Sequence, residues 1–435
     1  MLRLAFFIIQ FLLILALVAL LVSNSFIISF DIREYKYSFS SNIFFGCLLG
    51  LLFILYIIQY LYFKAKFSFH KYILVNKSKK LEKGYSFFVD AMIAIANKDN
   101  KKAISSNKKM LTYLKDDPTL SLLLQAEVLK IEKKFDQLSS VYEEMIKRRN
   151  TETLGYRGLM EQNLNQQDFH HAFIYGEKLF FLNPKIEKLY DTLIYIIAKT
   201  KNWNQLLLIT EKAFSHKIIE KDIANENKSI AYYEIAKIKM MSDSKESIKL
   251  IHKALSLKKN FAPYIKLYLE ILFSLNQVAQ VKKLLKKYWS ESPSSILRNV
   301  IADLLVANNL DDLELIKSVV NKNINHDDSK KLLIFFAIRL NNWELARSSI
   351  KGLLSTKPSR ELCLFMADIE AGEFNDIQKS DAWKLRAKNS DLENLWICKI
   401  TNQPQNEWES LSHSGYFNSL EWQQPKMLNQ FIETA

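Results

Sequence analysis

Length, composition and charge exclude several classes of protein before any motif is considered. The chain has 435 residues, of which 49% are hydrophobic and 24% are charged, so it is not a disordered chain. Nine glycines and seven prolines are few for this length, which favours an all-helical protein with short turns. Three cysteines, Cys47, Cys363 and Cys398, are too few for a disulfide framework. The net charge is +14, but basic residues form no stripe interleaved with aromatics, so we expect no nucleic-acid partner.

Two apolar stretches predict a membrane anchor in residues 1–63. Residues 4–22 and 43–63 contain no charged side chain, and at about 1.5 Å per residue each is long enough to cross a bilayer core. The first stretch follows Arg3 but lacks a small-x-small cleavage site, which favours an uncleaved span over a signal peptide. Residues 23–42 alternate large apolar and polar side chains, which predicts a short strand or hairpin lying on the outer face of the membrane, with a contact surface for a periplasmic partner as the alternative.

Lysine placement predicts the orientation of these spans. The basic juxtamembrane segment Lys64–Lys83 carries seven lysines against the single acidic residue Glu82, whereas residues 23–42 have no net charge. The positive-inside rule therefore predicts a two-span inner-membrane protein with both termini and the body in the cytoplasm. The same lysines could hold the chain against anionic lipid, at about 1 kcal/mol per charge.

Residues 84–389 carry an internal repeat that is clearest at residues 153–186. Two amphipathic helices are predicted there, with a turn at Asp168–Phe169 and an end at Pro184. The turn aromatics Phe135, Phe169 and Trp203 are 34 residues apart, and a helix–turn–helix period of 34 is typical of tetratricopeptide repeats. The residues that define the repeat are Phe135, Phe169, Ala172, Pro184, Trp203, Pro293, Trp343, Ala346 and Pro358. The predicted fold is all-α: two N-terminal transmembrane helices followed by a tetratricopeptide-type α-solenoid.

The repeat predicts helical pairs along the body and a different structure at the C-terminus. The predicted pairs cover residues 84–116, 119–150, 153–186, 187–218, 231–255, 263–293, 294–325, 327–358 and 359–389. About seven extra residues around 216–228 predict a loop or an extended helix, and the pair at 294–325 is poorly formed. Residues 390–435 contain aromatics without a helical period (Trp396, Trp408, Tyr416, Phe417 and Trp422), which predicts an irregular tail packed on the last repeat.

Motifs of catalysis are absent from the sequence. It contains no GxGxxG, GxxxxGK[ST], HExxH, CxxC or GxSxG pattern. His170 and His171 are interpreted as solvated turn residues, because neighbouring helix residues point about 100° apart and make poor joint ligands for a metal or haem. Cys47 and Cys363 are interpreted as packing residues. We therefore expect a non-catalytic protein whose first helices line a groove for peptides or helices of partner proteins.

Several stretches resemble one family in sequence and in order. They are Tyr85–Asp99, Tyr288–Pro293, Asn341–Arg347, Leu364–Glu370 with Gly372–Glu373, Trp383–Ala387, Trp396–Cys398 and Gly415–Trp422. Together with the two spans, the lysine-rich exit and the repeat body, they resemble the HemY tetratricopeptide membrane proteins of haem biosynthesis, of the alphaproteobacterial type. The resemblance implies a scaffold or regulator that contacts the late haem-biosynthesis enzymes at the membrane. That family shares its name with an unrelated flavin-dependent oxidase, which the missing glycine fingerprint argues against.

The resemblance also bears on cofactors. Some relatives in that family carry two cysteine pairs in the tail, a zinc knuckle, whereas the matching positions here are Cys398, Thr401, Leu411 and Ser414. Only Cys398 is retained, so we expect no metal and no cofactor, and no motif supports haem or porphyrin contact. Two alternatives stay open: a repeat adaptor for envelope or lipopolysaccharide assembly, and a porphyrin-binding carrier or enzyme.

Overall fold

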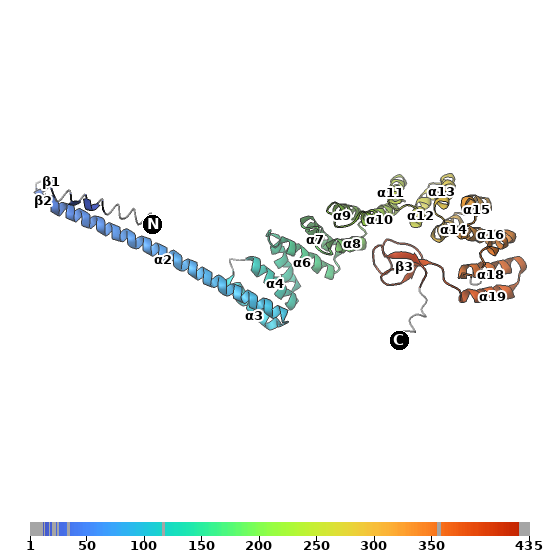
Figure 1. The fold of residues 1–435 in the computed structure, drawn as a ribbon, viewed down its shortest axis with the longest axis horizontal. Coiled ribbons are helices and arrows are strands. Elements are labelled where there is room, and N and C mark those ends of the chain that lie inside the picture. The colour runs from blue at the N-terminus through green and yellow to red at the C-terminus, as the bar shows by residue number, and fades with distance from the viewer. Residues whose placement is uncertain are drawn as a thin grey trace. The chain divides into compact units, whose positions relative to one another are not determined.

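A computed structural model describes residues 12, 14–16, 18, 19, 23, 26–32, 35–114, 118–354 and 358–425. These residues form two compact units, 1–134 and 135–435, each of which is described by itself (Figure 1). Most of the predicted first span, residues 4–22, lies outside the described residues. The prediction of two spans is therefore not confirmed.

The first unit begins with a hairpin that leads directly into a helix. Its elements are β1 (Ile27–Ile32), β2 (Tyr35–Ser40), α2 (Ser41–Ala96), α3 (Asn100–Tyr113) and α4 (Pro118–Glu132). The strands are antiparallel, with Ile27 opposite Ser40 and Ile32 opposite Tyr35. This pairing confirms the strand character predicted for residues 23–42.

Helix α2 is a single helix of 56 residues. It joins the predicted second span, the lysine-rich segment and the first helix of the first pair, which the sequence analysis separates at residues 63 and 83. The reason is local: residues 64–83 contain no proline, and lysine and leucine are good helix formers. Gly84 does not end the helix but brings it close to Leu114. Among the described residues, α2 is the one helix long and apolar enough to cross a membrane.

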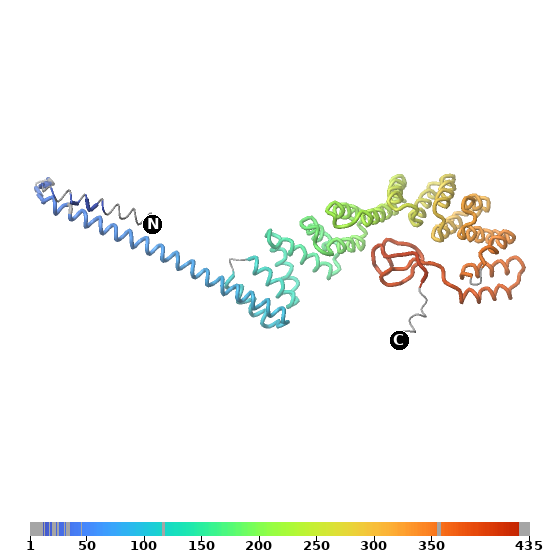
Figure 2. The backbone as a smooth tube through the Cα atoms, viewed as in Figure 1, coloured from blue at the N-terminus to red at the C-terminus, as the bar shows by residue number. Residues whose placement is uncertain are grey.

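The second unit is a succession of antiparallel helical pairs (Figure 2). Its helices are α5 (Phe135–Ile146), α6 (Glu152–Asn165), α7 (Phe169–Leu182), α8 (Leu189–Thr200), α9 (Trp203–Ser215), α10 (Lys221–Lys239), α11 (Ser244–Leu257), α12 (Ala262–Ser274), α13 (Val278–Glu291), α14 (Ser295–Ala307), α15 (Leu313–Val320), α16 (Asp327–Arg339), α17 (Trp343–Lys351), α18 (Arg360–Phe374) and α19 (Ile377–Lys388), with a 3₁₀ turn η1 (Asn321–Asn323). They confirm the predicted pairs within a few residues. The extra residues near 216–228 extend α10 to 19 residues, and the poorly formed pair ends in α15, which has eight.

The turns inside the pairs repeat one backbone device. Most of these turns contain three consecutive residues with fixed roles. The first has a positive φ, the second is the N-cap of the second helix, and the third is the aromatic or apolar residue that begins this helix. Gln167, at φ 60°, and Asp168 show it before α7: the Asp168 carboxylate accepts the backbone N–H of His171. That N–H and the imidazole of His171 lower the pKa of Asp168. Asn341, at φ 57°, and Asn342 repeat the device before α17. His170 and His171 follow the N-cap Asp168, so they lie in the first turn of α7, and both are exposed.

The repeat-defining residues differ in burial. Ala172 and Ala346 are fully buried and let neighbouring helices approach closely, and Trp203 is buried with them. Phe169, Trp343, Pro184 and Pro293 are half-buried, and Pro358 is buried. Phe135, by contrast, is 50% exposed, so an aromatic residue at the turn does not always enter the core.

The C-terminal tail corrects one prediction. It is not irregular: β3 (Leu395–Cys398), β4 (Pro404–Gln405) and β5 (Leu420–Gln423) form an antiparallel sheet in the order β4-β3-β5. We call residues 390–425 the C-terminal module; residues 426–435 lie outside the described part of the chain.

We expect Gly372→Ala to destabilise the solenoid, because a Cβ built on Gly372 would collide with the buried side of the Trp343 indole. Overpacking of this kind costs about 1–3 kcal/mol, more than the roughly 1 kcal/mol that alanine gains over glycine in a helix. The measurement is thermal unfolding of the full chain in detergent, followed by circular dichroism.

Gly352→Ala is the matched control, since its added Cβ would meet only the flexible Lys330 Nζ at 3.8 Å. Equal unfolding temperatures for the two variants would contradict the close contact between Gly372 and Trp343.

Candidate partner-binding groove

The first helices of five successive pairs line two neighbouring cavities on one face of the solenoid. These helices are α10, α12, α14, α16 and α18, and the C-terminal module contacts α10, α12, α14 and α18. We call this face, with the module on it, the groove. Side chains of the first helices line its two cavities, and the sequence did not predict that the C-terminal module covers part of this face (Figure 1).

Trp408 makes the most aromatic contacts between the module and the solenoid. The Trp408 ring lies edge-on to three aromatic rings of the solenoid, with centroid distances of 5.4 Å to Tyr233, 5.1 Å to Phe261 and 5.7 Å to Tyr264. Only 6% of Trp408 is exposed. Edge-to-face pairs contribute about 0.5–1.5 kcal/mol each beyond the burial of apolar area. The tail therefore packs on α10 and α12, in the middle of the solenoid, and the prediction that it packs on the last repeat is wrong.

The chain reaches this position by a turn that is fixed to the start of α18. The Glu393 carboxylate accepts the backbone N–H of Glu361, and Arg360 donates its backbone N–H to the carbonyl of Asp391. These contacts satisfy backbone groups at the N-terminus of a helix, which otherwise lack partners. They direct residues 389–394 back toward α14, where Trp422 Nε1 donates to Ser295 Oγ at 3.0 Å.

Charged and polar contacts complete the attachment. Lys266 of α12 pairs with Glu407 of the module at 2.8 Å. Burial alone would lower the pKa of Lys266, but Glu407 raises it, and in return Lys266 lowers the pKa of Glu407. Glu407 is largely exposed, so this pair orients the module more than it stabilises it.

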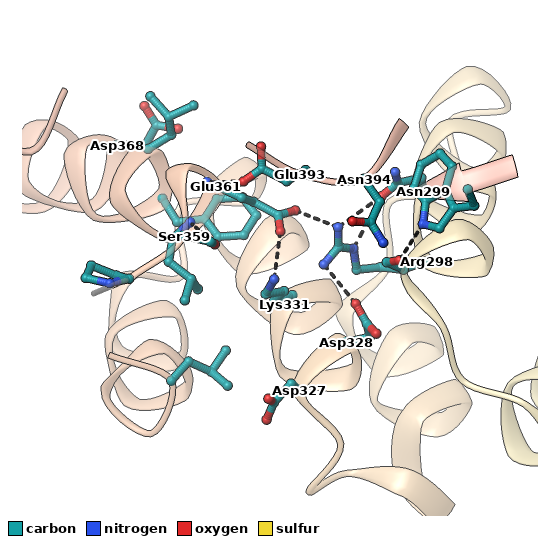
Figure 3. Close-up of a pocket in the computed structure, with 17 residues that line it drawn as sticks. Arg298, Asn299, Asp327, Asp328, Lys331, Ser359, Glu361, Asp368, Glu393 and Asn394 are labelled. Carbon is teal, nitrogen blue, oxygen red and sulfur yellow. Dashed lines mark hydrogen bonds and ion pairs between the residues drawn. The ribbon is translucent and has the colours of Figure 1, made fainter. Parts of the chain in front are cut away.

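A cavity of about 790 Å³ lies between the module and helices α14, α16 and α18. Arg298 lies at its wall, with its side chain only 7% exposed (Figure 3). Its guanidinium contacts Asp328 at 3.0 Å and Glu361 at 2.8 Å, and Lys331 contacts Glu361 at 3.1 Å. This network joins three successive first helices, so it fixes the spacing of the repeats that line the cavity.

The network itself follows the repeat. Arg298 and Lys331 are 33 residues apart, and so are Asp328 and Glu361, so each base contacts the acid of the following repeat. The sequence analysis missed these residues. A search for charged residues at the repeat spacing on the first helices is the signal that would have found them.

A second cavity, of about 280 Å³, lies between the module and helices α10, α12 and α14. Burial raises the pKa of Glu270 and of Asp303 in this cavity, and of Asp368 in the larger one. A carboxylate with a raised pKa is short of water or counter-charge, so a cation brought close to it would be favoured.

The two cavities together are acidic. Their lining contains nine acidic side chains (Glu270, Asp303, Asp327, Asp328, Glu361, Asp368, Glu393, Glu407 and Glu409) and four basic ones (Lys237, Lys266, Arg298 and Lys331). The chain as a whole has a net charge of +14, so the groove has the opposite sign.

The four positions matched to a zinc knuckle come together, but without metal ligands. Thr401 Oγ1 and Ser414 Oγ hydrogen-bond at 2.9 Å, and Leu411 forms a backbone bridge with Phe417. Two hydroxyls, one leucine and one thiol do not fit zinc. Across the described residues, no group of three or more histidine, cysteine or acidic side chains is placed to hold a metal.

Cys398 is buried, with 1% of its surface exposed, in the apolar cluster that the module shares with the solenoid. The Cys398 Sγ donates to Ser419 Oγ at 3.3 Å. Burial alone would raise the pKa of the thiol, but its hydrogen bonds with Ser419, Thr401 and neighbouring backbone groups lower the pKa to about 6. Cys363 is also fully buried, as its interpretation as a packing residue expects, whereas Cys47 is exposed on α2.

No protein-family model matches the chain, and no curated protein matches it. Solved structures that it is similar to include the TPR2AB-domain:pHSP90 complex of yeast Sti1, at 10% identity and a TM-score of 0.30, covering 70% of this chain and 98% of that one. Another is a tetratricopeptide repeat protein from Parabacteroides merdae, at 12% identity and a TM-score of 0.27, covering 57% and 92%. A third is yeast Tom70, at 12% identity and a TM-score of 0.27, covering 71% of this chain and 88% of that one. Similarity this low gives no information about the groove. Its geometry is therefore taken from the helical pairs of this chain alone.

We expect Trp408→Ala to release the module from the solenoid, because truncating a buried tryptophan costs about 3–5 kcal/mol. The released Cys398 becomes accessible, so labelling with a thiol reagent followed by mass spectrometry will show it modified.

Trp383→Ala, which truncates a half-buried tryptophan of α19, is the control and leaves Cys398 protected. Protection of Cys398 in the Trp408→Ala protein would contradict the anchoring role of this residue.

We expect Arg298→Met to destabilise the chain by about 3 kcal/mol, because the half-buried Asp328 then loses its partner and Glu361 keeps only Lys331. Arg157→Met is the control: its pair with Glu161 is exposed on α6 and contributes about 0.5 kcal/mol or less. Unfolding in urea measures both, and equal midpoints would show that the network does not join the repeats.

Proposed function

We propose that the protein is a non-catalytic, membrane-anchored scaffold that binds a partner protein in the groove. The observation that carries this proposal is the groove itself. Its cavities place apolar side chains such as Leu364 and Phe365 beside charged ones, on helices whose spacing the Arg298 network fixes. Solenoid faces of this kind suit extended or helical segments of other proteins.

The charge of the groove supports a partner segment that carries lysine or arginine. The lining has more than twice as many acidic as basic side chains. Glu270, Asp303 and Asp368, whose pKa values burial raises, gain most from a neighbouring cation. Complementary charge of this kind increases the rate of association and selects the partner.

Membrane anchoring is supported by α2. An 18-residue window of this helix has a mean hydropathy of 2.3, and only 6% of it is buried within the protein. The exposed Lys64–Lys83 segment follows on the same helix, where contact with anionic lipid would add to the anchoring. We propose an inner-membrane location with both termini and the solenoid in the cytoplasm, as the placement of the lysines predicts.

The process is supported by the sequence resemblance to HemY proteins. On that basis the partners are the late haem-biosynthesis enzymes, which oxidise porphyrinogen and insert iron. If porphyrins and haem do not depend on this protein, the adaptor role in envelope assembly takes its place.

The experiment measures extracted porphyrins and haem by fluorescence in cells depleted of the protein and then supplied with variants. We expect depletion to accumulate coproporphyrin or protoporphyrin and to lower haem, and the wild-type chain to restore both. The double variant Glu270→Lys, Asp368→Lys reverses two charges in the groove and should fail to restore them. Glu161→Lys, Glu314→Lys makes the same change in net charge on exposed positions outside the cavities and should restore them.

Each part of the proposal has its own contradicting result. Unchanged porphyrins on depletion contradict the role in haem synthesis. Full restoration by the Glu270→Lys, Asp368→Lys variant, with wild-type thermal stability, contradicts the groove as the partner site.

A further inference from the structure

The β1–β2 hairpin has two chemically different faces. Alternate side chains of a strand point to opposite faces, so Tyr35, Tyr37 and Phe39 of β2 share one face. Their rings form a row, with centroid distances of 6.4 Å from Tyr35 to Tyr37 and 6.5 Å from Tyr37 to Phe39. Ile28 of β1 lies opposite Phe39 in the register and belongs to the same face.

The other face is polar except for Ile27, which lies opposite Ser40 at the end next to α2. The register places Ser29 opposite Ser38 and Asp31 opposite Lys36. All four residues are exposed. The hairpin is therefore amphipathic: one face is aromatic and the opposite face is largely polar.

The aromatic face has no protein layer over it in the described part of the chain. Tyr35 is 71% exposed, Tyr37 48% and Phe39 45%. A two-stranded hairpin is at best marginally stable in water without a surface to pack on. Such a surface must be apolar enough for phenylalanine and must tolerate the hydroxyl groups of two tyrosines.

The hairpin is fixed to the end of the apolar part of α2. Ser41, the first residue of α2, donates its backbone N–H to the carbonyl of Phe26 at 2.9 Å, and its hydroxyl accepts the backbone N–H of Phe26 at 3.3 Å. The apolar stretch of α2 begins two residues later, at Ile43. In Figure 1 both strands lie at this end of the helix. If α2 crosses a bilayer, the hairpin lies at the level of the lipid headgroups.

We propose that the hairpin lies flat on the membrane, with the face of Tyr35, Tyr37 and Phe39 buried in the lipid interface at the non-cytoplasmic end of α2. The inference rests on the proposed membrane anchoring of α2. Tyrosine suits this depth because its ring is apolar and its hydroxyl is wet. Ser29, Asp31, Lys36 and Ser38 then face water. The hairpin fixes how far α2 enters the bilayer, because its polar face resists being drawn into the hydrocarbon.

The test compares three single tryptophan substitutions in the full chain, reconstituted in vesicles of phosphatidylcholine and phosphatidylglycerol. Tyr37→Trp probes the aromatic face, Ser38→Trp probes the polar face one residue away, and Phe53→Trp probes the middle of the uncharged stretch of α2. Bromine atoms quench tryptophan fluorescence on contact, so the vesicles contain lipids brominated either near the headgroup or deep in the acyl chain. The quenching of the wild-type protein, with its seven native tryptophans, is subtracted.

We expect Phe53→Trp to be quenched by the deep bromines, Tyr37→Trp by the shallow ones, and Ser38→Trp by neither. If Phe53→Trp is quenched while Tyr37→Trp and Ser38→Trp behave alike, the hairpin does not lie on lipid, although α2 does cross the bilayer. If Phe53→Trp is not quenched, the anchoring fails and this inference fails with it. Unchanged thermal unfolding of the three variants shows that the substitutions have not disturbed the fold.

Discussion

The second unit depends on one constraint: a helical pair cannot bury its apolar face by itself. Each pair therefore stacks on the next, and the contact is close only where a small residue lets two helices approach, as Ala172, Ala346 and Gly372 do. The left-handed turn residue and the N-cap that follows it set the angle at which the chain returns. These local devices recur at nearly constant spacing, so the first helices of successive pairs align side by side.

This alignment creates a surface that the solenoid does not cover with further helices. On α10 and α12 the surface is aromatic, and the C-terminal module covers it with Trp408. On α14, α16 and α18 the surface is charged, and the Arg298 network neutralises part of it. What remains open is an acidic groove with apolar patches, next to the module. The module is therefore a wall of the proposed partner site, and changes in its docking would change the shape of both cavities.

The repeat was predictable because it is local. Most helix bounds and turn residues follow from apolar periodicity and from the 34-residue spacing of Phe135, Phe169 and Trp203, whereas the sequence left residues 216–228 open as a loop or as the extended helix that α10 forms. The continuous α2 was missed because the sequence analysis drew boundaries where the chemistry changes from apolar to lysine-rich, although nothing there breaks a helix.

The C-terminal sheet could not be predicted in the same way. Its strands have four, two and four residues, which is too short to show an alternation of apolar and polar side chains. In addition, β3 pairs with β5, which lies far along the chain: Leu395 is opposite Gln423. The place where the sheet docks depends on Tyr233, Phe261 and Tyr264, which lie far from Trp408 in the sequence and look like ordinary core residues. The resemblance to a zinc knuckle predicts a compact tail. In the structure, two of the positions matched to zinc ligands, Thr401 and Ser414, contact each other through a hydrogen bond between their hydroxyl groups.

The most direct test of this account is a zero-length carbodiimide crosslink in the full chain, mapped by mass spectrometry. A carbodiimide joins a lysine to a carboxylate only when the two are in contact, and Lys266 Nζ lies 2.8 Å from Glu407 Oε1. The account predicts a peptide pair that links Lys266 to Glu407. A crosslink from Glu407 to Lys384 or Lys388 of α19, with none to Lys266, would place the module on the last pair and contradict the groove described above.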